Sequence, residues 1–111
     1  MIKIKYSKIN NLIKEIEVSG HANYDEEGKD IVCSAVSACV VGGLNALKSV
    51  NKYLVDIKKG NIKFDILDYV DDYDQIVLET IITQLYTIAE NYPKYVKIEK
   101  WKDGKSYEIK F

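Results

Sequence analysis

The sequence predicts an α+β fold in which two helices pack on one mostly antiparallel sheet of about five or six strands. Apolar residues alternate with polar ones near both ends of the chain and in its middle, which is typical of half-buried strands. Two longer segments between these strands repeat their apolar residues at helical spacing. Short turn signals separate the segments and no linker interrupts them, so we expect the 111 residues to form a single domain, 1–111.

The chain opens with a predicted hairpin. Residues 2–6 alternate apolar and polar side chains, Asn10 and Asn11 mark a turn, and a weaker strand pattern runs over 13–18. The first helix is predicted from residue 31 to about residue 50, because its apolar residues are too dense for a strand and recur at helical spacing.

A second pair of strands and a second helix are predicted in the middle of the chain. A turn at residues 59–61 precedes a strand at 62–66, and residues 54–57 are its expected partner. The second helix begins near residues 72–74, where acidic side chains suit the helix dipole. It ends before Pro93, which cannot continue a helix.

A last hairpin is predicted at the end of the chain. Its strands cover residues 95–101 and 106–111, and the segment 102–105 contains the Asp-Gly pair of a tight turn. The order of elements is therefore two strands, a helix, one or two strands, a helix and two strands, which favours both helices on one sheet.

Composition and charge exclude several classes of function. The formal net charge is −1 and all sixteen basic residues are lysines, so the chain lacks the arginine fork suited to phosphate and we expect no direct nucleic-acid partner. No apolar stretch approaches the roughly 20 residues that cross a bilayer, and the first residues do not resemble a secretion signal. We therefore expect a cytoplasmic protein with no membrane partner and with free cysteines.

Metal and cofactor sites are not expected either. One histidine and two separated cysteines do not supply the ligand set of a zinc site. The acidic segment 68–79 lacks the glycine that a calcium loop needs, and no glycine-rich phosphate loop is present.

The chemistry concentrates around the single histidine, His21, and the first cysteine, Cys33. Between Gly20 and Gly28 the sequence has no helical or strand period, which predicts a loop. Asp30 directly precedes the apolar helix and can cap it, so Cys33 falls in the first helical turn, where the helix dipole favours a thiolate. His21 is the imidazole available to take the thiol proton.

Other residues near Cys33 have two readings each. Asp30 is either a helix cap alone or also the group that orients the imidazole. Ser37, one turn beyond Cys33, either lines the site or bonds to a backbone carbonyl. The backbone N–H groups of Cys33 and Ser34 are the expected oxyanion donors, and Cys39 is expected to be an inert core residue.

The whole run resembles the ribosomal-processing cysteine protease family, known as Prp. The likeness lies in G-H-A at residues 20–22, G-x-D-I-V-C at 28–33 and A-V-S at 35–37. The stretch LYTIAENYP at 85–93, followed by a Val-Lys-Ile strand, is also similar, so the likeness covers most of the chain.

This resemblance implies specific roles. It implies that Cys33 is the nucleophile and His21 the base, and it maps Gly20, Asp30 and Ser37 onto further positions that the family keeps. Ser34 stands where the family more often has alanine, which places a hydroxyl beside the nucleophile.

It also implies a partner and a substrate. Family members are cytosolic homodimers that remove a short N-terminal extension from large-subunit ribosomal protein twenty-seven, cutting after a phenylalanine. An acidic, arginine-free chain would attract such a basic substrate. The Gly42-Gly43 pair in the first helix is either a dimer contact or a site of internal packing.

Two other functions remain open on the sequence. One is a noncatalytic ribosome-assembly or peptide-binding protein that uses the same cleft without cutting. The other is a redox-sensing thiol at Cys33. Peptide turnover separates both from a protease.

Overall fold

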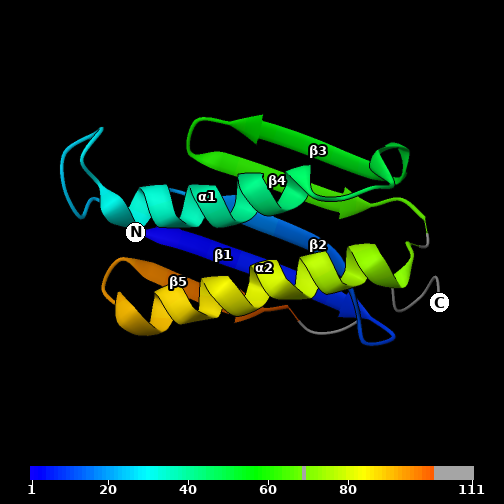
Figure 1. Cartoon of the computed structure of the whole chain (residues 1–111). Coiled ribbons are helices and arrows are strands. Elements are labelled where there is room, and N and C mark those ends of the chain that lie inside the picture. Colours follow the sequence, from blue (N-terminus) through cyan, green and yellow to red (C-terminus); the bar gives the residue numbers. More distant parts are fainter. Residues whose placement is uncertain (69, 102–111) are drawn as a thin grey trace.

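Two helices lie side by side across one face of a five-stranded sheet (Figure 1). The computed structural model describes residues 1–68 and 70–101. Its two layers confirm the predicted α+β class. Within residues 1–68 and 70–101, no helix is both long enough and apolar enough to cross a lipid bilayer.

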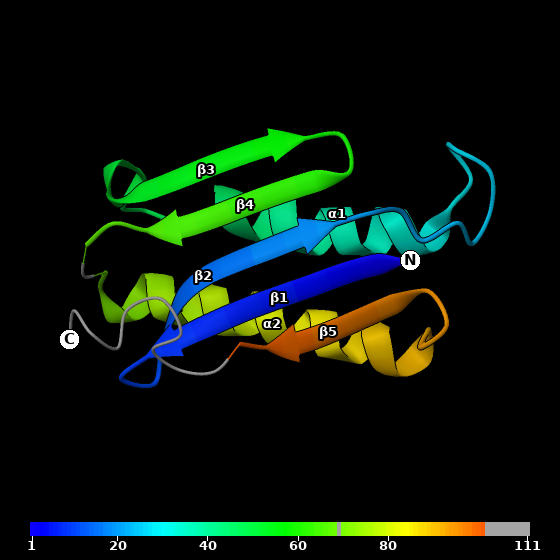
Figure 2. The ribbon, with the colours of Figure 1, turned by 180° about the vertical axis from the view of Figure 1, so that it is seen from behind.

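The sheet has the order β3-β4-β2-β1-β5, so β3 and β5 form its edges (Figure 2). All neighbouring strands are antiparallel except β1 and β5, which are parallel. The strands are β1 (Ile2–Ile9), β2 (Leu12–Ser19), β3 (Tyr53–Lys58), β4 (Asn61–Ile66) and β5 (Val96–Lys100).

The predicted opening hairpin is confirmed. Strands β1 and β2 pair up to Ile9 and Leu12, which leaves Asn10 and Asn11 as a two-residue turn. Their φ angles are 53° and 65°, the left-handed conformation that a tight hairpin turn requires and that asparagine tolerates.

The first helix, α1 (Ile31–Asn45), ends earlier than the sequence pattern predicts. The chain turns after Asn45 because the backbone N–H groups of Lys48 and Ser49 donate to the Asp74 carboxylate, each over 3.0 Å. A short 3-10 turn, η1 (Val50–Lys52), then leads into β3.

The second helix, α2 (Asp72–Asn91), begins and ends where the sequence predicts. Twenty helical residues span about 30 Å, so α2 carries the chain back along the full length of the sheet. For that reason β5 starts at the same end as β1 and runs parallel to it (Figure 1). The predicted partner strand of the last hairpin, 106–111, lies outside the described residues.

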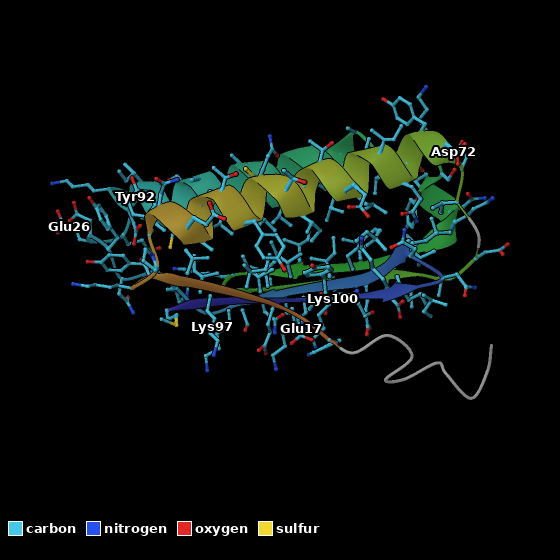
Figure 3. The ribbon with its side chains drawn as sticks, turned by 90° about the horizontal axis from the view of Figure 1, so that it is seen from below. Glu17, Glu26, Asp72, Tyr92, Lys97 and Lys100 are labelled. Atoms are coloured by element: carbon cyan, nitrogen blue, oxygen red, sulfur yellow. The ribbon has the colours of Figure 1, made fainter. Side chains whose placement is uncertain are left out.

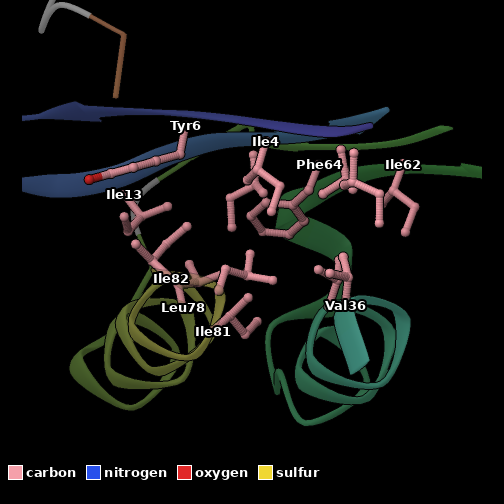
Figure 4. Packing of buried hydrophobic residues seen from close by; sticks show 14 of the residues in the cluster. Ile4, Tyr6, Ile13, Val36, Ile62, Phe64, Leu78, Ile81 and Ile82 are labelled. Carbon is pink, nitrogen blue, oxygen red and sulfur yellow. The ribbon is translucent and has the colours of Figure 1, made fainter. Parts of the chain in front are cut away.

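The core fills the space between the helices and the sheet. Strand residues such as Ile4 and Phe64 face Leu78 and Ile81 of α2 and Val36 of α1, and all are nearly fully buried (Figure 4). The opposite face of the sheet carries charged side chains, with Glu17 and Lys97 pointing away from the helices (Figure 3). One buried face in each of β1, β2 and β4 explains the period of two in their sequences.

The Gly42-Gly43 pair is divided between two environments. A Cβ at Gly43 would overlap the side chain of Ile81, so this glycine lets α1 and α2 approach each other. Gly42 is exposed and a Cβ there would meet nothing within 4 Å. Internal packing therefore explains Gly43, although its neighbour is α2 and not the sheet.

Candidate active site

Cys33 occupies the first turn of α1, as the sequence predicts. Asp30 precedes the helix in an extended conformation, and its Oδ1 accepts hydrogen bonds from the N–H groups of Val32 and Cys33, both over 3.0 Å. The predicted cap is thus confirmed, and it sets where the helix begins relative to the thiol.

The second oxygen of Asp30 holds the loop that carries His21. Its Oδ2 accepts from the backbone N–H groups of Tyr24, at 2.9 Å, and Asp25, at 3.4 Å. Burial alone would raise the pKa of the Asp30 carboxyl, which is 7% exposed, but these four backbone donors hold it below its usual value. Both oxygens are occupied, and in the described part of the chain Asp30 makes no hydrogen bond with His21.

The residues on either side of His21 are both held through their own backbone N–H groups. Gly20 donates its N–H to the carbonyl of Gly60 over 2.9 Å, and Ala22 donates its N–H to Cys33 Sγ over 3.3 Å. The pairing of β2 with β4 places Gly20 beside Gly60, because Ser19 and Asn61 are its last partners. His21 itself is exposed, but the residue on each side of it is held by a hydrogen bond.

A pocket of about 350 Å³ opens between this loop, the start of α1 and the β3–β4 turn. It brings together four of the predicted site residues, whereas Gly20 stands next to His21 and Ser37 lies exposed one turn further along α1. The lining residues are His21, Asn23, Asp25, Glu27, Gly28, Asp30, Cys33, Ser34 and Lys59.

The expected oxyanion donors are not free. The N–H of Cys33 is taken by the Asp30 side chain, and the N–H of Ser34 donates to the Asp30 carbonyl over 3.1 Å as part of the helix. In this structure the helix cap and the first hydrogen bond of the helix already use both groups, and their role as oxyanion donors stays a prediction.

Comparison with known proteins follows from this geometry. The family model described as cysteine protease Prp matches residues 1–97. The chain belongs to the Prp family of cysteine proteases. The resemblance drawn from the sequence motif is therefore confirmed.

Curated Prp proteins are similar over most of their length. The ribosomal processing cysteine protease Prp of Staphylococcus aureus is 30% identical over 90 residues, which cover 78% of this chain and 85% of that protein. The Bacillus subtilis Prp is 32% identical over 94 residues, covering 78% and 84%.

Solved Prp structures share the fold. The crystal structure of S. aureus Prp with a covalently linked product peptide matches with a TM-score of 0.81 at 27% identity, over 91% of this chain and 100% of the other. A second S. aureus Prp structure, with a substrate peptide, matches with a TM-score of 0.72 at 27% identity over the same shares. This chain is thus a ribosomal-processing cysteine protease by family.

Lys59 and Glu27 join the Prp pocket although the sequence motif does not contain them. Lys59 Nζ and Glu27 Oε1 lie 2.6 Å apart, linking the β3–β4 turn to the loop. The hydrogen bond and charge of Lys59, and to a lesser extent the nearby His21, hold the pKa of Glu27 below its usual value, while Glu27 raises the pKa of Lys59. The sequence predicts a turn at 59–61, but only the pairing of β4 with β2 shows that this turn lies beside the loop that carries His21.

Tyr24 holds the other side of the loop between Gly20 and Gly28. Its ring meets Tyr92 and Tyr95 edge-on, with centroids 5.7 Å and 5.1 Å away. These three tyrosines pack against one another between the loop and the α2–β5 connection.

Cys39 has a different environment from Cys33. It is partly buried against the core, and burial raises the pKa of its thiol. A thiol that stays protonated is a poor nucleophile, as expected for a core cysteine. Within residues 1–68 and 70–101, no group of three or more His, Cys, Asp or Glu side chains is arranged to hold a metal ion.

Proposed function

We propose that this Prp-family chain, as one catalytic domain over residues 1–111, is a cysteine endopeptidase with Cys33 as nucleophile and His21 as base. The observation that carries the proposal is that both residues line one pocket at the N-terminus of α1. Cys33 Sγ also accepts the N–H of Ala22, the residue that follows His21, over 3.3 Å.

The proposed reaction has two halves. His21 takes the thiol proton, the thiolate attacks the peptide carbonyl, and the imidazolium then gives its proton to the leaving amine. The acyl group remains on Cys33 as a thioester. A water molecule, deprotonated by His21, cleaves the thioester and frees the new carboxylate and the thiol.

The proposed substrate is the N-terminal extension of large-subunit ribosomal protein twenty-seven, cut after a phenylalanine. The S. aureus relatives that bind a substrate peptide and a covalently linked product peptide support a peptide substrate. The loop beside the pocket carries Asp25, Glu26 and Glu27, all exposed, and this charge suits a substrate attached to a basic ribosomal protein. With this substrate, we propose that the enzyme acts in the cytoplasm and as a homodimer.

Peptide cleavage tests this function. The purified protein is incubated with a peptide that spans the extension of the host's own ribosomal protein, beside Cys33→Ala, His21→Ala and Cys39→Ala variants, and products are identified by mass spectrometry. We expect cleavage after phenylalanine by the wild type and by Cys39→Ala, and none by the other two. A peptide that binds without being cut would instead support the noncatalytic peptide-binding function.

A further inference from the structure

The imidazole of His21 lies against the bare Cα of Gly60, in the turn between β3 and β4. A Cβ built on Gly60 would stand 2.8 Å from His21 Nε2 and 3.2 Å from Cε1. Ordinary contacts between such atoms are about 3.5 Å or longer. Only glycine, which has no Cβ, therefore leaves enough space for the imidazole in this position.

The same glycine also holds the backbone that leads into His21. Its carbonyl accepts the N–H of Gly20 over 2.9 Å, and its own φ is +76°, a conformation that suits glycine. Figure 1 shows the β3–β4 turn and the loop after β2 at the same end of the molecule. On the other side, Ala22 is tied to Cys33. His21 thus stands in a segment that is tied to Gly60 on one side and to Cys33 on the other, and its side chain shares a pocket with Cys33.

We propose that Gly60 is a positioning residue for His21, acting through the imidazole and not on the substrate. This inference rests on the proposed function, in which His21 is the base for Cys33. A side chain on Gly60 would push the ring off its seat and change its distance to the thiol. The charged or titratable groups that share the pocket with the ring are Asp25 and Glu27 of the loop, Asp30 and Cys33 at α1, and Lys59 of the turn.

Two substitutions at this position separate the clash from backbone strain. Gly60→Ala adds a Cβ and also strains a positive φ. Gly60→Asn adds a Cβ with much less strain, since asparagine tolerates the left-handed region and does so at three positions of this chain. Asn11→Ala, at φ 65° in the β1–β2 turn, is the control for strain remote from the pocket.

Two measurements report on the position of His21 separately from the stability of the fold. The first is kcat and KM for the extension peptide. The second is the rate at which iodoacetamide modifies Cys33 between pH 5 and 9, measured by peptide mapping, with thermal unfolding as the check on folding. We expect Gly60→Asn to lower kcat roughly ten- to a hundredfold with KM little changed, because small displacements of a reacting group have effects of that size. Its alkylation profile should shift toward that of His21→Ala.

A D-alanine at position 60, introduced by chemical synthesis of the 111-residue chain, is the rescue variant. It accepts a positive φ without strain and puts its methyl on the other side of the Cα. We expect it to restore kcat and the alkylation profile. The proposal is overturned if D-alanine is as inactive as L-alanine, or if a folded Gly60→Asn protein keeps the wild-type kcat and profile.

The two proposals fail in different ways. If the wild type does not cleave the peptide, the alkylation profiles still test whether Gly60 positions the imidazole of His21. If His21→Ala abolishes cleavage while Gly60→Asn cleaves normally, the proposed function stands and the role of Gly60 falls.

Discussion

The backbone N–H of Ala22 points at the sulfur of Cys33 over 3.3 Å, and Ala22 is the residue that follows His21. The loop and the helix are therefore joined at the sulfur of the proposed nucleophile. Asp30 joins them a second time, through N–H groups of both segments. Its two oxygens have separate tasks, which mutation can separate.

Asp30→Asn should keep α1 capped but release the loop. The asparagine oxygen can still accept from Val32 and Cys33, whereas its NH₂ group would face the N–H groups of Tyr24 and Asp25. We expect faster amide hydrogen exchange at Tyr24, measured by NMR, and peptide cleavage slowed by roughly tenfold. Asp30→Ala should in addition lower the melting temperature. Unchanged exchange at Tyr24 in the asparagine variant would show that the loop does not depend on this oxygen.

Acidic residues of the loop should speed capture of a basic substrate. We expect kcat/KM to fall about tenfold as NaCl rises from roughly 50 to 500 mM, because salt screens attraction between exposed charges. Neutralising Asp25, Glu26 and Glu27 together should remove most of this dependence. Asp72→Asn, at the far end of α2, is the control. A salt-insensitive wild type would contradict electrostatic capture.

The paired glycines of α1 should respond in opposite ways to alanine. Gly42→Ala should raise the free energy of unfolding by about 0.5–1 kcal/mol, because alanine favours the helix and its Cβ meets no neighbour. Gly43→Ala should lower it by about 1 kcal/mol, since its Cβ overlaps buried Ile81. Urea denaturation of the two proteins checks both signs. Equal shifts would mean that the helices do not touch at Gly43.

The buried carboxylate of Asp74 should make stability depend on acid. Asp74 is fully buried and accepts hydrogen bonds from the N–H groups of Lys48 and Ser49 and from the hydroxyl of Tyr53. Burial raises its pKa, but these donors outweigh burial and hold the pKa below its usual value. We expect Asp74→Asn to lower the free energy of unfolding by about 2–3 kcal/mol at pH 7.

The sign of the pH effect follows from that lowered pKa. The folded protein binds the proton more weakly than the unfolded chain, so the stabilisation is complete above the unfolded pKa near 3.9. It is lost as pH falls through the lower folded pKa. The gap between wild type and Asp74→Asn should therefore narrow below about pH 4 in urea denaturation. Tyr53→Phe, which removes one donor, should lose about 2 kcal/mol at pH 7.

Local signals account for the parts of the fold that the sequence predicts well. Two asparagines define the β1–β2 turn, Asp30 caps α1 and Pro93 follows the end of α2. Each of these signals acts within a few residues. A motif of local residues also places Cys33 and His21 in one pocket.

Features that depend on distant pairing are the ones that the sequence does not predict. Lys59 and Gly60 read only as a turn, and the register of β4 with β2 is what puts them beside His21. The early end of α1 depends on Asp74, which is separated from Lys48 by a strand hairpin. The N–H of Cys33 likewise already has an acceptor, because the Asp30 side chain caps the helix.

The contact between Met1 and Gly20 governs how the enzyme should be handled at the bench. A Cβ at Gly20 would overlap the carbonyl oxygen of Met1, and the next residue, Ile2, donates its N–H to Tyr95 over 2.8 Å. An affinity tag fused ahead of Met1 would begin next to Gly20, the residue that precedes His21 of the candidate pocket. We therefore expect a tag at this end to lower the measured turnover more than the same tag at the other terminus.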